Sequence, residues 1–587
     1  MPSLQPKHIA RRDEARTAIL RGVNSLADVV VATLGPCGLP SLLDQGPFSP
    51  PRISRDGVTV ARHIHLADPV ANLACQLLYQ AAKKTADSAG DGTTTCCAIA
   101  QSLVRDGIRL VAAGANPTLL KRGIDQATLA ITGQKGEDGR YAGGTLAALT
   151  IPVSSPEVIA QVGTLSANSD PAIGNLIAAA LAQVGKDGTV TVEESQSLET
   201  TLEVVEGMQF NQGYLSPYFI TDGERMESVL VGDDQTSPLF VLLHEKPLRH
   251  LNEILPILNN VIAPNNAALL IVAEDITDSA LAFLAINRFQ GRLRACAVKG
   301  PGFGDRRRAL FDDLAVLTGA TLISPELGLK PDNITREMLG RATKVTVTKD
   351  DCTITGGMGD PTMLEARRND LREQIKQTAS DYDRIRLEER LAKLTGGVAV
   401  VKVGGQTEAE MKERKDRAED AMYATKAAVL EGIVPGGGVA LIRATGADQF
   451  VSAFDNVFDT DTKAGWRLVI RACEEPLRRI VQNAGGEGGE IVAEFWRKVN
   501  ESQLVGRGDV PEGFGYDAAA GKFCDLLAVG VIDPARVTRT ALLAASSIAG
   551  LLLTNEAIVA DNVVAAAEVR KSLTPVLPGG QQQMLQY

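Results

Sequence analysis

The segment Ala89–Thr95 (AGDGTTT) places one acidic residue between two glycines and follows it with three threonines. Glycines let a backbone approach an anion closely, and free amides at a helix N-terminus attract phosphate. Aspartate binds hard cations through oxygen, and hydroxyls can donate to phosphate or ligate the same ion. Because the apolar, helix-compatible run Cys96–Val104 follows, the segment indicates a site for phosphate and magnesium at the start of a helix.

The same residues are also typical of an ordinary helix start after a glycine turn, because Asp and Thr are common capping residues. The segment is not a Walker A loop, which requires a lysine before its final Ser or Thr, since no lysine lies here. A nucleotide site and a structural cap are therefore both open interpretations of this segment.

Four further segments fit one phosphate site, and each also has a structural interpretation. Thr33–Pro36 is a helix end with a tight turn, and Ser54–Gly57 ends in an Asp-Gly pair that is typical of turns. Gly436–Gly438 precedes a helix, at a cost in backbone entropy that favours a functional use. Asp420 lies inside a long predicted helix, where aspartate is a poor helix former and is commonly solvated.

Length and composition limit the classes of protein to which the chain can belong. With 587 residues, 44% of them hydrophobic and 22% charged, the chain is globular and too long for one core. The net charge of −11 argues against a nucleic-acid surface. No apolar run of membrane-spanning length is evident, so we expect neither nucleic acid nor a membrane as a partner. The eight cysteines form no CxxC motif, which predicts buried thiols in a reducing cytosol.

Hydrophobic periodicity predicts a helical outer part around an α/β centre. Helices are expected over 11–33, 70–89, 96–113, 119–131, 364–394 (a charged hairpin) and 408–432, and again over much of 440–566. Strands are expected at 189–192, 202–205, 267–273, 295–298 and 398–403. The simplest arrangement is nested: both chain ends form one helical domain, and the middle is a separate α/β domain. The segments 132–144, 222–238, 445–464 and 486–512 are predicted to be loops.

Ordered segments from about Ile9 to about Asp561 resemble the group I chaperonins, the GroEL family. The segments are Ala32–Gly38, Asp56–Arg62, Ala89–Thr95, Gly114–Asp125, Gln161–Asp170, Val205–Ile220, Pro301–Arg307, Gly396–Val403, Glu419–Thr425, Pro435–Ile442 and Asp533–Arg539. So many long matches in the same order identify the chain as a member of that family.

The resemblance implies a multidomain α and α/β fold of three nested domains. A helical equatorial ATP-binding domain is expected from residues 1–148 and 431–587, an intermediate hinge domain from 149–205 and 399–430, and an α/β apical domain from 206–398. Hinge positions implied by the family are Pro152, Gly432, Gly207 and Gly397.

The resemblance also implies a site for ATP with Mg²⁺ and K⁺. Asp91 is expected to hold Mg²⁺, whereas Asp420 orients the water that attacks the γ-phosphate, with support from Asp56. The remaining nucleotide-binding positions are Thr33, Leu34, Gly35, Pro36, Arg55, Gly92, Thr93, Thr94, Thr95, Gly437, Asp517, Ala518, Ala519 and Asp533.

The apical domain of the family binds non-native protein and a lid co-chaperonin on one apolar surface. The matching residues are Tyr214, Tyr218, Phe219, Leu255, Leu258, Leu281, Ala285 and Ile286. Hydrophobic periodicity by itself instead predicts that these residues belong to a buried core. The implied protein is an ATP-hydrolysing chaperonin of the cytoplasm that folds client proteins in a chamber. It would form rings of seven subunits, single or stacked in pairs, with a GroES-type lid.

Three departures from the family pattern keep an alternative function open. Arg55 replaces the usual lysine, Asp517 replaces the usual asparagine, and the C-terminal tail lacks the Gly-Gly-Met repeat. Arginine differs from lysine in geometry, and a carboxylate cannot donate as an amide does. The alternative is a diverged oligomeric holdase or scaffold with weak ATP turnover or single-ring assembly.

Overall fold

The chain folds into two compact units, one discontinuous and one continuous. Unit 1 falls within residues 1–178 and 406–587, and unit 2 within 179–405. This agrees with the predicted multidomain arrangement, in which the two ends form a helical part and the middle an α/β part. The computed structural model describes residues 7–45, 51–136, 141–153, 155–167, 170–185, 188–195, 197–223, 225–232, 237–263, 267–302, 304–324, 334–378, 381–505 and 510–561.

The further division into three domains remains a prediction. Of the segments expected in the intermediate domain, 149–178 and 406–430 fall in unit 1, whereas 179–205 and 399–405 fall in unit 2. Helix α8 (Pro171–Val184) runs across the position where the two units divide.

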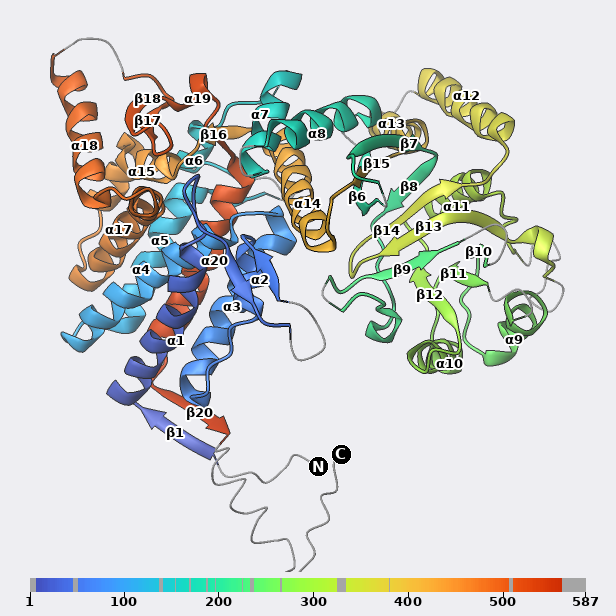
Figure 1. Ribbon diagram of the computed structural model, residues 1–587, viewed down its shortest axis with the longest axis horizontal. Helices are drawn as coiled ribbons and strands as arrows, with labels where there is room; N and C mark the ends of the chain where they lie inside the picture. The colour runs from blue at the N-terminus through green and yellow to red at the C-terminus, as the bar shows by residue number, and fades with distance from the viewer. Residues whose placement is uncertain are drawn as a thin grey trace, which may run out of the picture. The chain divides into compact units, whose positions relative to one another are not determined.

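Long helices from both ends of the chain form the core of unit 1 (Figure 1). They are α1 (Asp13–Val31), α3 (Pro69–Ala89), α4 (Thr93–Ala112), α5 (Pro117–Thr132), α17 (Thr460–Asn483) and α20 (Ala535–Leu553). Helix α17 packs on α4 and α5, and α20 packs on α3, α4 and α5. Since only 4% of the residues are aromatic, Ala, Val, Leu and Ile fill this core, and small side chains allow close helix packing.

The two ends of the chain also pair as strands. Strand β1 (Lys7–Arg11) runs antiparallel to β20 (Ala557–Asp561), with Lys7 opposite Asp561, and the side chains of these two residues form an ion pair. Residues more than 500 positions apart therefore meet at one edge of unit 1 (Figure 1).

Helix α20 is long and apolar enough in composition to cross a membrane, contrary to the expectation that no such run exists. Most of its apolar window, 61%, is buried inside the protein. Long apolar helices are also typical of the core of a large helical unit, and the packing of α20 on α3, α4 and α5 accounts for its many apolar residues.

Shorter elements of unit 1 surround this core. They are β2 (Ser41–Leu43), β3 (Arg52–Ser54), α2 (Gly57–Arg62), β4 (Gln134–Lys135), β5 (Tyr141–Ala142), α6 (Thr145–Ala148), α7 (Pro156–Ser166), α14 (Glu408–Glu431), β16 (Ile433–Pro435), α15 (Val439–Gly446), α16 (Asp448–Asp455), α18 (Gly488–Val505), β17 (Phe514–Asp517), β18 (Lys522–Asp525), α19 (Leu526–Val529) and β19 (Ile532–Pro534). Strands pair as β2 with β3, β4 with β5, β16 with β19 and β17 with β18, all antiparallel.

The segments predicted as loops contain regular structure, so that prediction was wrong for much of their length. Residues 486–512 include α18, in which Val492 and Phe495 join a small core with Leu477 and Val481 of α17. Residues 445–464 include α16, whose Phe450 ring lies 5.0 Å from the Trp466 ring. In each case the apolar side of the helix is buried against another helix, α17, and this tertiary packing is not visible in the local pattern of the segment itself.

Unit 2 is built on a mixed seven-stranded sheet. Its strands are β8 (Gly207–Phe210), β9 (Ser228–Val231), β10 (Leu239–His244), β11 (Ala268–Ala273), β12 (Arg294–Lys299), β13 (Gly340–Val347) and β14 (Cys352–Gly357). Strands β10, β11 and β12 are parallel neighbours, whereas β13 pairs antiparallel with β10, β9 and β14. Strands β10 and β11 are buried at every position, as parallel strands covered on both faces must be.

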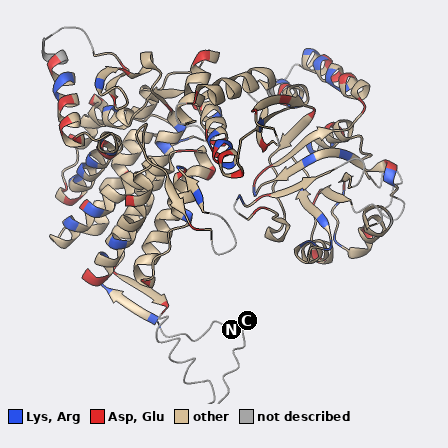
Figure 2. Ribbon diagram, in the orientation of Figure 1, with Lys and Arg blue, Asp and Glu red and all other residues tan. Residues whose placement is uncertain are grey.

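Helices and a second sheet complete unit 2. The elements are β6 (Thr189–Glu194), β7 (Thr201–Val205), β15 (Val398–Val403), η1 (Pro217–Phe219), η2 (Leu251–Glu253), α9 (Leu255–Ile257), η3 (Leu258–Ile262), α10 (Asp278–Phe289), α11 (Asp305–Thr318), η7 (Arg336–Met338), α12 (Pro361–Gln377) and α13 (Asp381–Gly396). Strand β15 lies between β6 and β7. The predicted charged hairpin is present as α12 and α13, and Figure 2 shows both signs of charge along α12.

A buried carboxylate fastens that hairpin to unit 2. Asp313 of α11 is fully buried, and its oxygens accept from Arg367 Nε at 2.8 Å and from Arg390 Nε at 2.7 Å. A buried charge is tolerated only when it is paired and hydrogen-bonded, so this triad fixes α12 and α13 against α11.

Candidate functional site

One cavity of unit 1, with a volume of about 370 Å³, is lined by every residue that the sequence analysis assigned to the nucleotide. The cavity lies among α2, α4, α14, α15 and the β17–β18 hairpin. The assigned lining residues are Thr33, Leu34, Gly35, Pro36, Arg55, Asp56, Asp91, Gly92, Thr93, Thr94, Thr95, Asp420, Gly437, Asp517, Ala518, Ala519 and Asp533. Their roles in binding and catalysis remain predictions.

The N-terminus of α4 faces this cavity without a side-chain cap. Gly92, with φ 87°, is the N-cap residue, and no side chain accepts from the first amides of the helix. A Cβ at Gly92 would come within 2.7 Å of Val537 Cγ1, so only glycine fits against α20 here. The 20-residue helix α4 thus directs free amides and the positive end of its dipole toward the cavity, as an anion site requires.

A second helix begins at the same place. Asp56 caps α2 and accepts from Val58 N at 3.1 Å and from Thr59 N at 3.0 Å. A Cβ at Gly57 would lie 2.5 Å from the hydroxyl oxygens of both Thr93 and Thr94. The Asp-Gly pair is therefore both a helix cap and the contact that lets α2 start beside α4.

The Thr33–Pro36 turn is stabilised by hydrogen bonds from a residue in the C-terminal part of the chain. The Thr33 hydroxyl donates to Val30 O at 2.8 Å. Asn483, the last residue of α17, donates its side-chain amide to Val31 O and to Leu34 O, both at 2.9 Å. Sequence analysis missed Asn483, because its partners lie more than 400 positions away and no local signal marks it.

Two short strand pairs form the far wall. Asp517 ends β17, and its Oδ1 accepts from Ala519 N at 2.9 Å and from Ala520 N at 3.1 Å. An asparagine oxygen could accept the same two bonds, so the carboxylate preserves the turn that positions Ala518 and Ala519. Asp533 lies in β19 opposite Val434 of β16.

Helix α14 contributes one face to the cavity. Glu413, Asp416, Arg417 and Asp420 all line it, and their spacing of three or four residues places them on one side of a helix. Only Asp420 was predicted; the other three could have been found from this spacing. Arg417 donates to Glu413 from Nε at 3.0 Å, and Asp416 pairs with Arg52 of β3 at 2.6 Å.

Burial and neighbouring carboxylates raise the pKa values of three acids in the cavity, Asp420, Asp91 and Asp533. Burial, followed by repulsion from Asp56 and Asp91, raises the pKa of Asp420 well above its usual value. Burial also raises the pKa of Asp91, a hydrogen bond from Gly92 N opposes that rise, and Asp56 adds to it. Burial and the nearby Asp91 raise the pKa of Asp533 to about 7.

This donor set fits a hard cation that arrives with other ligands. Among the described residues, no group of three or more His, Cys, Asp and Glu side chains could hold a metal ion by itself. Mg²⁺ is commonly bound by one or two carboxylates together with phosphate oxygens, and the carboxylate of Asp91 lies beside the amides of α4. The excess of negative charge at the cavity is what a divalent cation would neutralise.

Unit 2 exposes an apolar patch formed by Tyr218, Ile286 and Phe289. The exposed fractions of these residues are 59%, 54% and 73%, and the Tyr218 and Phe289 rings meet edge to face at 5.5 Å between centroids. Phe289 was not predicted, although it follows Ile286 by three positions on α10. Exposed apolar clusters of this kind mark binding surfaces.

Three residues expected on the apical binding surface are instead buried in unit 2, so their predicted exposure was wrong. Phe219 is fully buried, and Leu258 and Ala285 are 6% and 5% exposed. Each belongs to the hydrophobic core of unit 2, because its side chain points inward while that of an adjacent residue is exposed. Tyr214, Leu255 and Leu281 are partly buried.

Two of the predicted hinge residues, Pro152 and Gly432, fall in unit 1, and the other two, Gly207 and Gly397, fall in unit 2. That they mark crossings between domains remains a prediction. Ile151, next to Pro152, exchanges backbone hydrogen bonds with Ile433, next to Gly432. Gly432 has φ 87° and follows α14. In unit 2, Gly207 begins β8, and Gly397, with φ 63°, precedes β15. Motion at these positions remains a prediction.

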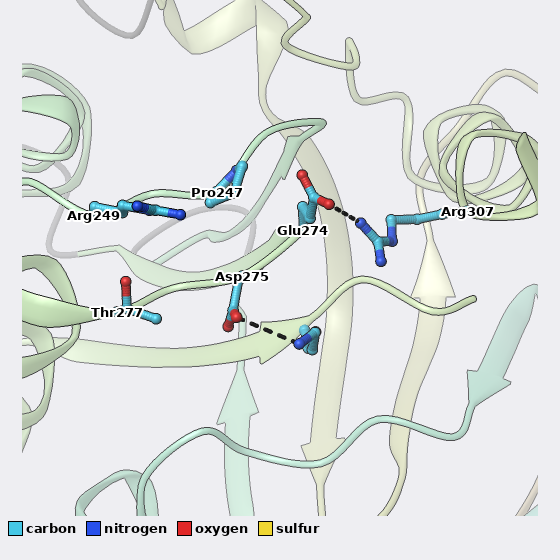
Figure 3. A pocket seen from close by; sticks show the side chains of 7 residues that line it. Pro247, Arg249, Glu274, Asp275, Thr277 and Arg307 are labelled. Atoms are coloured by element: carbon cyan, nitrogen blue, oxygen red, sulfur yellow. Dashed lines mark hydrogen bonds and ion pairs between the residues drawn. The ribbon is translucent and has the colours of Figure 1, made fainter. Parts of the chain in front are cut away.

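A smaller cavity of about 240 Å³ in unit 2 lies at the carboxyl ends of β10, β11 and β12 (Figure 3). Arg307 pairs with Glu274 at 2.6 Å, and Lys299 pairs with Asp275 at 3.4 Å. Arg249 and Thr277 complete its polar wall. Because its carboxylates already face cations, this cavity has the character of an ion-pair network.

Comparison with known protein families finds a match that includes residues of both units. The family model described as "TCP-1/cpn60 chaperonin family" matches residues 26–563, a span that includes the cavity, the apolar patch and the predicted hinges.

The titration of Asp533 provides a test of the cavity's electrostatics. Because its pKa in the folded protein, about 7, lies above the usual 3.8, Asp533 contributes stability below about pH 4 that is lost as pH rises through 7. We expect Asp533→Asn to raise the melting temperature at pH 8 by more than at pH 5, with about 1–3 kcal/mol gained at pH 8. Calorimetry at both pH values measures this, and an equal change at both would contradict the assignment.

Proposed function

Because the chain belongs to the TCP-1/cpn60 chaperonin family, and is thereby a protein-folding chaperone, we propose that it is an ATP-dependent group I chaperonin of the cytoplasm. In this proposal it captures non-native proteins and lets them fold in a chamber formed by a seven-membered ring, closed by a GroES-type lid. The observation that carries the proposal is the meeting of the α4 N-terminus, Asp91 and Asp420 at one cavity.

The proposed binding of ATP rests on the complementarity of the cavity to phosphate. The free amides of α4 and the hydroxyls of Thr93, Thr94 and Thr95 supply donors, and Arg55 adds a positive charge. Asp91 would hold Mg²⁺, which neutralises phosphate charge when bound, and K⁺ is a further cofactor expected from the family resemblance. Gly437, with φ 65°, lies at the start of α15 and lets the backbone approach the ligand closely.

The proposed hydrolysis depends on positioning. Asp420 reaches the cavity from α14, whereas Asp91 belongs to the loop before α4. A carboxylate with a raised pKa in a site of like charges is suited to accept a proton from water or to orient it. Asp56 is held by its capping bonds to Val58 and Thr59, so it would act by shaping the charge around that water.

The proposed capture of clients rests on the patch of Tyr218, Ile286 and Phe289. These side chains are exposed and cluster on η1 and α10. Non-native proteins expose apolar segments, and an apolar surface binds them by removing both surfaces from water. The cost of exposing the patch in the free protein is what binding would recover.

Asp420→Ala should reduce ATP hydrolysis about a hundredfold or more while ATP still binds, because a positioned catalytic group is removed and no phosphate contact is lost. Steady-state phosphate release and equilibrium nucleotide binding measure the two effects. Lys412→Ala is the matched control, since Lys412 lies on the same helix and pairs with Glu408 outside the cavity. Hydrolysis by Asp420→Ala above half the parental rate would show that the assignment is wrong.

Asp91→Ala should abolish the Mg²⁺ dependence of ATP binding, because the phosphates would then face the remaining carboxylates without the cation. Titration calorimetry of ATP with Mg²⁺ and with EDTA measures the difference. We expect Mg²⁺ to tighten binding in the parent and to have little effect in the variant. An unchanged affinity for Mg-ATP would contradict the proposed role, and a parent that captures clients without binding ATP would favour the holdase.

Tyr218→Glu and Phe219→Glu form a matched pair for client capture. Tyr218 is 59% exposed and Phe219 is fully buried. A carboxylate at Tyr218 stays solvated and should block capture of unfolded protein without changing the melting temperature. A carboxylate at Phe219 is buried without a partner and should destabilise unit 2 by several kcal/mol. The melting temperature and the amount of a chemically unfolded client that is captured are measured for both variants, and they distinguish the two effects. If Tyr218→Glu captures as much client as the parent does, the patch does not bind clients.

A further inference from the structure

Unit 1 contains a second cavity, of about 680 Å³, between α3, α20 and the β4–β5 hairpin. We call it the hairpin cavity. None of the described residues that line it also lines the nucleotide cavity. The short hairpin arises from the segment 132–144, which the proposed chaperonin function does not use.

Positive charge dominates the lining of the hairpin cavity. Among the described residues that line it, Lys84, Lys135, Arg536 and Arg539 face a single carboxylate, that of Glu431. Lys84 and Lys135 are exposed, and neither makes an ion pair with a described residue. The one carboxylate thus leaves most of the positive charge available to a ligand.

Arg539 is the most enclosed of the four cations. Its side chain is 11% exposed, one of its terminal nitrogens donates to Glu431 at 3.0 Å, and its Cζ lies 4.1 Å from the centre of the Tyr141 ring. Its Nε is buried and has no hydrogen-bond partner among the described residues. A buried donor without a partner is uncommon in folded proteins, and it adds to the positive electrostatic character of the cavity wall.

Arg536 is only partly compensated. Its Nε lies 3.8 Å from Glu431 Oε1, and its side chain is 36% exposed. Because Glu431 pairs with both Arg536 and Arg539, its single negative charge compensates only part of the positive charge of the two guanidinium groups. A planar guanidinium binds a carboxylate with two parallel hydrogen bonds.

Apolar side chains form another part of the cavity wall. Leu77 and Ala81 of α3 contribute to it, as do Leu543, Ala544 and Ile548 of α20. A site with apolar walls and a few placed charges is the usual form of a pocket for small organic molecules. Inorganic ions would leave those walls uncovered.

From these observations we propose that the hairpin cavity binds a small amphipathic carboxylate, with its aliphatic or aromatic body against α3 and α20 and its carboxylate among Lys84, Lys135 and Arg536. This site is separate from the proposed ATP site, and its test does not depend on nucleotide binding. Octanoate serves as the probe.

Protection of a thiol in the cavity tests the proposal at the site itself. Ser547 lines the cavity and is exposed, so Ser547→Cys introduces a thiol that a neutral maleimide can alkylate. Octanoate should slow this alkylation in a saturable way, as measured by peptide mass spectrometry on the full chain. Exposed Cys37 is the internal reference for reagent reactivity, and buried Cys473 reports any unfolding.

Charge and chain length of the probe are varied next. Octylamine should give no protection, because its ammonium meets four cations, and acetate should require at least tenfold higher concentrations, because it lacks an apolar body. In the Ser547→Cys background, Lys84→Glu with Lys135→Glu should raise the half-protecting octanoate concentration about tenfold. Lys83→Glu, next to Lys84 on α3 but outside the lining, should leave it unchanged.

Each outcome of these experiments either supports or contradicts the proposal. Saturable protection by octanoate whose half-protecting concentration rises about tenfold or more in the Lys84→Glu, Lys135→Glu variant, with Cys473 still unreacted, supports the site. Alkylation that octanoate does not slow, equal protection by octylamine, or equal protection in the charge-reversed variant would each overturn the proposal.

Discussion

Repulsion among Asp56, Asp91 and Asp420 is the interaction on which the rest of the candidate site depends. The three carboxylates come from the N-cap of α2, from the loop before α4, and from α14, and burial, followed by repulsion from Asp56 and Asp91, raises the pKa of Asp420. Folding does not relieve this repulsion, since the cavity offers few cations. The arrangement is costly unless a cation and its phosphate ligands occupy the site, which is why the geometry favours nucleotide over a purely structural helix cap.

Close approach of two helix N-termini makes that crowding possible. At Gly57 a Cβ would collide with the hydroxyls of Thr93 and Thr94, and at Gly92 it would collide with Val537 of α20. Any larger residue would separate α2 from α4 or α4 from α20. The glycines therefore serve packing and site geometry at once, and the two interpretations of the AGDGTTT segment are compatible: it is a helix start, and it lines the cavity.

Unit 2 uses its apolar residues in two ways. Strands β10 and β11 bury all of theirs in the sheet, whereas η1 and α10 leave Tyr218, Ile286 and Phe289 exposed. Tyr218 and Phe219 are adjacent in sequence, but the side chain of Tyr218 is exposed to solvent, whereas that of Phe219 is buried in the core of unit 2. An apolar binding surface of this type needs a rigid core directly beneath it, so that exposed side chains do not collapse inward.

The sequence by itself determined the class of the fold and the composition of the cavity. Helix and strand periodicity located most long elements, because amphipathic spacing acts within a few residues. The residues that the cavity brings together came mostly from the family resemblance carried by ordered segments such as AGDGTTT and PGGGVALI, since glycine turns by themselves also fit a purely structural interpretation.

Only the tertiary structure decided which side chains face the cavity, the core or the solvent. Asn483 joins the site by bonds to residues near position 31, and α18 exists because Val492 and Phe495 find a core on α17. Whether Phe219 or Tyr218 is exposed depends on how η1 packs, and the hairpin cavity depends on Tyr141 reaching Arg539. Tertiary contacts, whether between successive helices or between residues hundreds of positions apart, leave no periodic trace in either segment, so burial and charge pairing at these points follow from packing alone.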